Sequence, residues 1–199
     1  MNVLLSLTNR LSLLSHTLYF IRKHLLVLVG LGLIAAVGRV IQLGGFGPIT
    51  SGFHIFLEVI IEVARGVLFV YVLGLASLKH GASRIKHLFT DKSSRKHYWR
   101  VALQKGKKQW AEILLNFLLF LGIAWVFNYL IDTLAYQTCL YLALKKNEII
   151  SQTSSEWTII LFFKNLSVIP FTLTFQALFL LWIINKSRGQ AIVKAVQPK

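Results

Sequence analysis

Three ionisable residues, Glu58, Glu62 and Arg65, lie within an apolar run that covers residues 53–78. A charged side chain standing alone at the centre of a membrane helix costs about 2.5–3.5 kcal/mol on insertion scales. On an ideal helix these three side chains and His54 fall within about 80° of one another, so they form one polar stripe. Such a stripe must be paired, or must face water or other protein segments. The sequence therefore predicts an intramembrane polar site here.

Ion pairing is the simplest chemistry for this stripe. Glu62 and Arg65 are three residues apart and can pair along the helix. Charges inside a helical bundle are tolerated mainly when they pair with one another, so we expect a network of zero net charge in the outer half of the membrane. The other apolar runs supply its remaining members: Arg39, Asn128, Asp132, Lys164 and Asn165. Pro170 interrupts the last run and predicts a kink there.

Metal binding is an alternative use of the same side chains. His54, Glu58 and Glu62 are spaced by four residues, as in the carboxylate-rich metal sites of helical bundles. However, the basic members of the network would compete for these carboxylates, and the chain has no second Glu-x-x-His element. Phosphate loops, GxSxG, HExxH and dinucleotide-binding motifs are also absent from the sequence. We therefore predict no metal, no cofactor and no catalytic residues.

The elements that must position the stripe are apolar runs long enough to cross a membrane. The chain has 199 residues, of which 55% are hydrophobic and only 15% are charged, which is too apolar for an ordinary soluble domain. Since a spanning helix needs about 20 apolar residues, the sequence predicts an all-α, polytopic protein with four transmembrane helices. These spans cover residues 25–43, 53–78, 113–135 and 157–184. A glycine-rich turn at residues 44–48 makes the first two spans an antiparallel hairpin.

The basic residues predict the orientation of these spans. The chain has 22 Lys and Arg against 7 Asp and Glu, and most of the basic residues fall before the first span, in loop 79–109 or in tail 185–199. By the positive-inside rule, both termini and this loop are cytoplasmic, in a bacterial inner membrane or a plasma membrane. We expect the loop to contact anionic lipid, with a protein partner or nucleic acid as less favoured alternatives. The predicted lipid contacts are Lys86, Arg95, Lys96, Arg100, Lys105, Lys107 and Lys108.

The first 24 residues have the pattern of an amphipathic interfacial helix. Leucine or isoleucine recurs every three or four residues from Leu4 to Ile21, which places these side chains in one stripe. The same spacing would also suit a partner-binding or self-associating helix. A cleavable signal peptide is disfavoured because the apolar run starts only after Arg22 and Lys23. Cys139, the single cysteine, is expected to be a small apolar filler.

These observations predict a non-enzymatic membrane protein that is a small channel- or transporter-like unit. In this interpretation the polar network surrounds a pathway for a proton, an ion or a polar solute. The alternative is a structural or regulatory membrane subunit, in which the charges hold the helices together or bind a partner. A protein partner or a homo-oligomer is expected in either case. A metal-dependent membrane enzyme is the least favoured of the three hypotheses.

Overall fold

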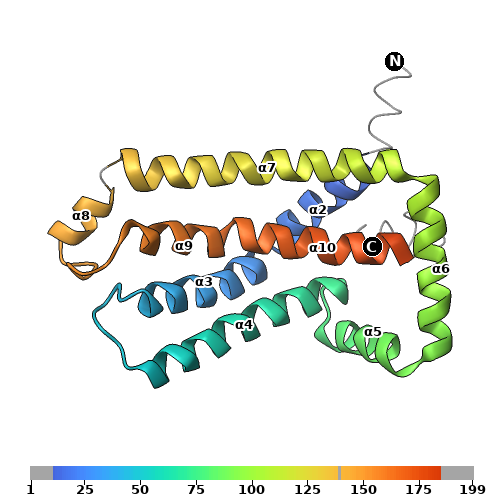
Figure 1. The fold of residues 1–199 in the computed structure, drawn as a ribbon, viewed down its shortest axis with the longest axis horizontal. Helices are drawn as coiled ribbons and strands as arrows, with labels where there is room; N and C mark the ends of the chain where they lie inside the picture. Colours follow the sequence, from blue (N-terminus) through green and yellow to red (C-terminus); the bar gives the residue numbers. More distant parts are fainter. Residues whose placement is uncertain (1–10, 139, 185–199) are drawn as a thin grey trace, which may run out of the picture. The chain divides into compact units, whose positions relative to one another are not determined.

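The computed structural model describes residues 11–138 and 140–184, without the side chains of residues 92–94. Every regular element in this part of the chain is an α-helix (Figure 1). Helices satisfy their own backbone hydrogen bonds, as a membrane requires. In chain order the helices are α2 (Ser12–Lys23), α3 (Leu25–Gln42), α4 (Ser51–Leu73), α5 (Leu78–Thr90), α6 (Lys92–Lys108), α7 (Trp110–Gln137), α8 (Leu140–Lys146), α9 (Glu156–Leu166) and α10 (Val168–Ile184).

Three stretches are long and apolar enough to cross a membrane: α3, α7, and α9 together with α10. A fourth is added if α4 and α5, which meet at 88°, are counted as one broken span. This composition indicates a membrane protein. The predicted first span matches α3 to within one residue, and α7 contains the predicted third span.

The prediction for the second span was wrong at its end. Helix α4 stops at Leu73, five residues before the expected end, and the apolar residues that follow form a turn. Leu75 and Ala76 have positive φ angles of 50° and 72°, so the chain leaves the helical conformation there. A sequence of apolar residues cannot signal such a turn by periodicity alone.

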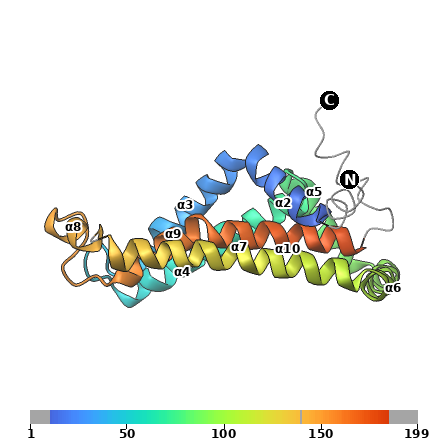
Figure 2. The same cartoon turned by 90° about the horizontal axis from the view of Figure 1, so that it is seen from above.

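The basic segment after α4 is helical. It forms α5 and α6, and α7 begins after a break at Gln109. In Figure 2, α6 is seen almost end-on while α7 lies across the view, so the chain turns sharply between them. The predicted loop 79–109 is therefore a pair of helices.

The chain packs into two compact units, each built from segments distant in sequence. The described part of unit 1 comprises residues 11–25, 69–122 and 173–184, and that of unit 2 comprises residues 26–68, 123–138 and 140–172. In unit 1 the aromatic rings of Phe120 and Phe175 stack at 4.4 Å between centroids, with Phe117 packed edge-on against Phe175. The buried Asn116 side chain accepts a hydrogen bond from the Leu14 amide at 3.1 Å, which caps the first turn of α2.

The described part of the N-terminal helix buries the predicted stripe only in part. Leu14 of that stripe is buried together with Leu13, Thr17 and Phe20, whereas Leu18, another member, is about half exposed. Leu4 and the other positions before residue 11 lie outside the described residues. Cys139 and tail 185–199 also lie outside them.

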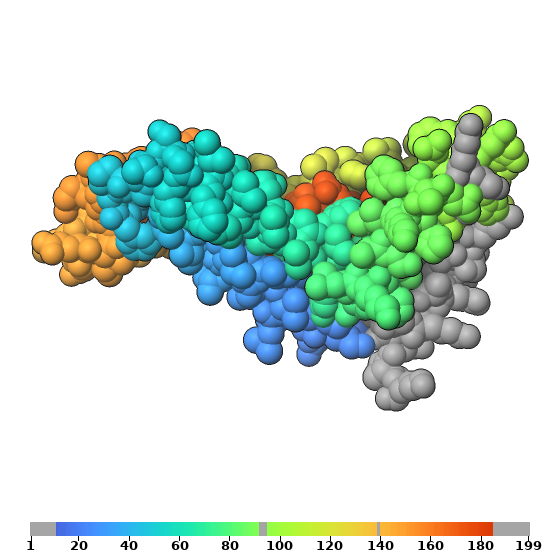
Figure 3. Space-filling model, turned by 90° about the horizontal axis from the view of Figure 1, so that it is seen from below, coloured from blue at the N-terminus to red at the C-terminus, as the bar shows by residue number. Residues whose placement is uncertain are grey.

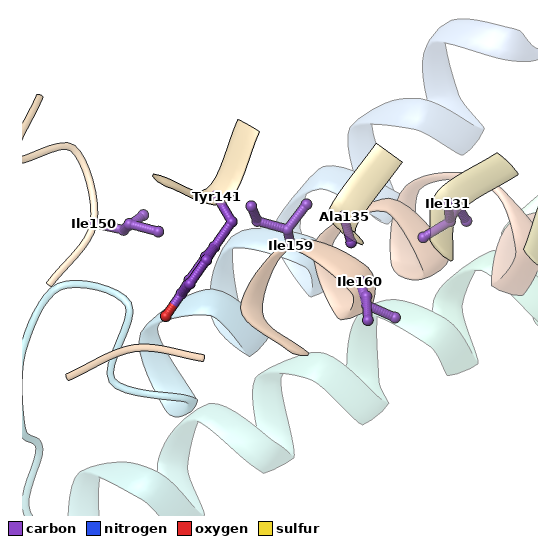
Figure 4. Close-up of a cluster of buried hydrophobic side chains, with 6 residues drawn as sticks. All are labelled: Ile131, Ala135, Tyr141, Ile150, Ile159 and Ile160. Atoms are coloured by element: carbon purple, nitrogen blue, oxygen red, sulfur yellow. The ribbon is translucent and has the colours of Figure 1, made fainter. Parts of the chain in front are cut away.

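The core of unit 2 lies where α7, α8 and α9 meet. Ile131, Ala135, Tyr141, Ile150, Ile159 and Ile160 form this buried cluster (Figure 4). The Tyr141 hydroxyl donates a hydrogen bond to the Ser154 carbonyl, so its polar end is satisfied within the core. This packing secures the connection between α8 and α9 and holds α9 in place for the site described next.

Candidate functional site

The polar stripe of α4 is placed in unit 2 by the turn that joins α3 to α4. Gly44 and Gly47 have φ angles of 72° and 113°, a conformation that glycine adopts without strain. Gly38 lets α4 approach α3 closely, since a Cβ there would lie 3.0 Å from Cγ1 of Ile61. The turn and this close packing bring the last helical turns of α3 beside the first turns of α4.

The first polar cluster joins Arg39 and Gln42 of α3 to His54 and Glu58 of α4. Arg39 forms a two-pronged ion pair with Glu58, with Nη1 3.0 Å from Oε2 and Nη2 3.3 Å from Oε1. Gln42 completes the cluster by accepting from Arg39 Nη1 at 2.6 Å and donating to Glu58 Oε2, also at 2.6 Å. Gln42 is itself buried, and its amide bridges the two charged groups.

His54 lies at the edge of this cluster. The Gln42 amide nitrogen is 3.3 Å from His54 Nδ1 and 3.3 Å from the His54 carbonyl oxygen. The rest of the His54 side chain is exposed.

The second polar cluster lies further along α4. Arg65 pairs with Glu62 at 2.5 Å and donates through Nη2 to Asn165 Oδ1 of α9 at 2.7 Å. Asn165 is buried and also donates to the Leu161 carbonyl at 2.7 Å. The Arg65 Nε atom is buried and has no hydrogen-bond partner among the described residues. Arg65 therefore ties α4 to α9 with one donor position unused.

A break in the helix lies next to Asn165. Helix α9 ends at Leu166 and α10 begins at Val168, with Ser167 between them. Pro170 falls in the first turn of α10, where a missing backbone N–H is tolerated. Gly32 of α3 packs on this break, because a Cβ at Gly32 would lie 3.0 Å from the Asn165 carbonyl oxygen.

The remaining predicted members take no part in the hydrogen bonds and ion pairs of either cluster. Asp132 is exposed on α7 and Lys164 is partly exposed on α9, and neither takes part in the two ion pairs. Asn128 donates to the Ala124 carbonyl of its own helix at 2.8 Å. The structure thus brings four of the six expected charges together, as two separate pairs.

The two ion pairs share an asymmetry of exposure. The Arg39 and Arg65 side chains are 19% and 21% exposed, whereas their partners Glu58 and Glu62 are 43% and 55% exposed. The guanidinium groups are therefore held within the protein and the carboxylates emerge at its surface. In a membrane-spanning segment this surface requires water or another protein segment beside it.

The structure gives the metal hypothesis no support. Within the described residues, no group of three His, Cys, Asp or Glu side chains could hold a metal ion. Glu58 is already bound by Arg39 and Gln42, which occupy the oxygens that a metal would need.

Most of the predicted lipid-contact residues are exposed on α5 and α6: Lys86, Arg95, Lys96, Arg100, Lys107 and Lys108. Lys105 differs from these. Its ammonium group lies 3.9 Å from the centre of the Trp182 ring and donates to the Trp182 carbonyl in the last turn of α10. Burial lowers the pKa of Lys105, and the nearby Glu112 carboxylate opposes that shift.

Sequence reasoning missed one central residue of the site, Gln42. An amide one turn after Arg39, within an apolar run, was the available signal. The fold and these clusters define an all-helical protein with three or four helices able to cross a membrane. One ion pair joins α3 to α4, and a second lies within α4. No family model, curated protein or solved structure matches the chain.

Proposed function

We propose that this chain is a four-span membrane protein in which the α4 stripe lines a pathway for a proton or a small polar solute. In this proposal α3, α4, α7 and the α9–α10 pair cross the membrane, with α5 and α6 on the cytoplasmic side. The excess of Lys and Arg in α5 and α6 supports that orientation. The proposed function is non-enzymatic.

The observation that carries the proposal is the exposure of the two carboxylates beside their more buried arginine partners. A pair that only held helices together would be expected to bury both partners. A carboxylate that emerges from a spanning segment, with its cation fixed behind it, can instead accept and release a proton or contact a passing polar group.

The spacing of the stripe suits a relay. His54, Glu58 and Glu62 follow one another at four-residue intervals on one helix. With a rise of 1.5 Å per residue, successive positions lie about 6 Å apart along the helix axis. That distance is too long for direct proton transfer between fixed groups, but one bridging water can span it.

Flux through reconstituted protein tests this proposal. Proteoliposomes are loaded with a pH-sensitive dye, a pH gradient is applied, and Glu58→Gln and Glu62→Gln are compared with the native chain. Both substitutions keep the size of the side chain but replace a carboxylate by an amide that does not titrate, so proton flux should fall. Glu148→Gln is the matched control, because Glu148 is exposed in the connection after α8. Native-like proton and solute flux in both stripe variants would reject the pathway.

A second candidate function is a membrane subunit whose α4 binds a partner chain. It is favoured by the side chains around Glu62, since Ile55, Val59 and Val63 are all more than half exposed. An apolar helix face with one carboxylate suits a close helix–helix contact. In that case Glu62→Gln should weaken association with the partner or with a second copy without altering flux. The mass of the purified protein in detergent tests this hypothesis. A monomer with no bound partner, both for the native chain and for Glu62→Gln, would count against it.

A further inference from the structure

The corner between α4 and α5 is built as a rigid joint. The two helices meet at 88°. Figure 1 shows the turn of the chain between them. A Cβ at Gly81 would lie 2.0 Å from the Val70 carbonyl oxygen, and one at Gly74 would lie 1.8 Å from the Ser77 carbonyl oxygen. Arg84 donates to the Leu73 carbonyl at 2.5 Å, which caps the end of α4. Backbone contact and a capping side chain therefore fix the direction in which α5 leaves α4.

Helix α5 has two distinct faces. Leu78, Ala82, Ile85 and Phe89 share one side of the helix at spacings of three and four residues. Phe89 is 80% exposed, although it belongs to this apolar face. In Figure 3 the outward side of α5, in green, forms part of the molecular surface.

A basic strip borders the apolar face. Lys79, Ser83 and Lys86 lie at positions i, i+4 and i+7 of α5, and all three are exposed. The chain has no acidic residue from position 66 to position 90, and the next one, Asp91, lies at the C-terminal end of α5. Two ammonium groups and a hydroxyl on one strip are suited to bind phosphate oxygens.

We propose that α5 lies flat in the cytoplasmic membrane interface and binds the phosphate of anionic phospholipids through Lys79, Ser83 and Lys86. Spanning helices tilt by about 20° on average from the membrane normal, so a helix fixed at 88° to α4 runs close to the membrane plane. The apolar face with Phe89 then enters the acyl boundary, and the lysines at its border reach the headgroups. This surface is separate from the carboxylates of α4.

A lipid accounts for both faces of α5, whereas a soluble phosphate compound or a nucleic acid would account only for the basic strip. The proposed ligand is therefore a lipid with an anionic headgroup, such as phosphatidylglycerol. If these residues instead bind a soluble anion, inorganic phosphate should displace the lipid in the experiment described below.

Lipid retention by the full-length protein tests the headgroup contact. Phosphatidylglycerol is titrated into the detergent-solubilised protein, and bound lipid is counted by native mass spectrometry, with phosphatidylcholine as the neutral comparison. Lys79→Gln and Lys86→Gln should each weaken phosphatidylglycerol binding about fivefold, from about 1 kcal/mol per basic residue near an anionic surface. The double variant Lys145→Gln/Lys146→Gln on α8 is the control for a change in net charge and should bind as the native chain does.

Insertion of the apolar face is measured separately. A nitroxide is attached at Phe89→Cys in a chain carrying Cys139→Ser, reconstituted in phosphatidylcholine vesicles with one third phosphatidylglycerol. The label should be relaxed by oxygen, which partitions into the membrane, rather than by a water-soluble nickel complex. Three results would each overturn the proposal: preferential relaxation by nickel, equal loss of lipid in the α8 control, or displacement of the lipid by millimolar inorganic phosphate.

Discussion

Replacing Gln42 with alanine removes the bridge between the two charged groups of the first cluster. The Gln42 amide accepts from Arg39 at 2.6 Å and donates to Glu58 at 2.6 Å. The truncation leaves both partners of the Arg39–Glu58 ion pair in place, which are 3.0 Å apart in the native structure, but each partner loses one short hydrogen bond. Because Gln42 is buried, the vacated space does not provide bulk water as a replacement.

The loss of stability expected for Gln42→Ala follows from these two hydrogen bonds. A hydrogen bond to a charged group contributes about 1.5–3 kcal/mol, and removing one partner from a buried site leaves the other unsatisfied. Glu58 is 43% exposed, so water recovers part of its loss, and the Arg39 contact carries most of the cost. We therefore expect Gln42→Ala to lower the free energy of unfolding by about 2–3 kcal/mol.

The assay is reversible unfolding in mixed detergent micelles, followed by far-ultraviolet circular dichroism as denaturing detergent is added. Gln176→Ala is the matched control, because Gln176 is an exposed glutamine in α10 and should change stability by less than about 0.5 kcal/mol. Combining Gln42→Ala with Glu58→Gln in a double-mutant cycle should give a coupling of about 1–2 kcal/mol. The bridging role is refuted if Gln42→Ala matches the Gln176 control or if the coupling is zero.

Two further predictions concern the corner of α4 and the start of α3. Gly81→Ala should destabilise the protein by about 2 kcal/mol because its methyl group meets the backbone of α4. Gly106→Ala is the control: with open space around it, this substitution should stabilise the protein by about 0.5–1 kcal/mol. Equal effects of the two substitutions in the same unfolding assay would contradict the close packing at the corner between α4 and α5. Burial, together with the Lys23 charge, lowers the pKa of His24 below 6.5, so the unfolded chain binds the proton more tightly. Stability should therefore fall as the pH drops from 6.5 through the pKa of folded His24. His24→Gln should reduce this dependence. A melting temperature with the same pH dependence in the native chain and in His24→Gln would contradict this prediction.

Much of the helical architecture could be predicted from residue types alone. Long apolar runs located α3, α7 and the α9–α10 pair, because a helix that can cross a membrane needs a minimum apolar length. The glycines at positions 44 and 47 marked the turn after α3, since both adopt positive φ angles there. The end of α4 could not be predicted in this way. It depends on close backbone contacts around Gly74 and Gly81 and on positive φ angles at Leu75 and Ala76, which a run of apolar residues does not signal.

The candidate site, too, could be predicted from the sequence only in part. The helical spacing correctly placed Glu62 within reach of Arg65, as their 2.5 Å contact shows. The partner of Glu58 was not specified by its own helix, and the expected single network left its pairing open. The tertiary structure assigned Arg39 and Gln42 to it, from a helix that the preceding turn folds back alongside α4.

The sequence by itself determined that this chain is helical, strongly apolar and basic, and that α4 carries ionisable side chains on one face. Those properties depend on composition and on a helical repeat that is the same in every protein. Only the tertiary structure decided which charges meet, which carboxylates emerge at the surface, and that α5 turns away from α4 at 88°. Pairing and exposure depend on contacts between residues distant in the chain, such as Arg65 with Asn165, and no local spacing encodes those contacts.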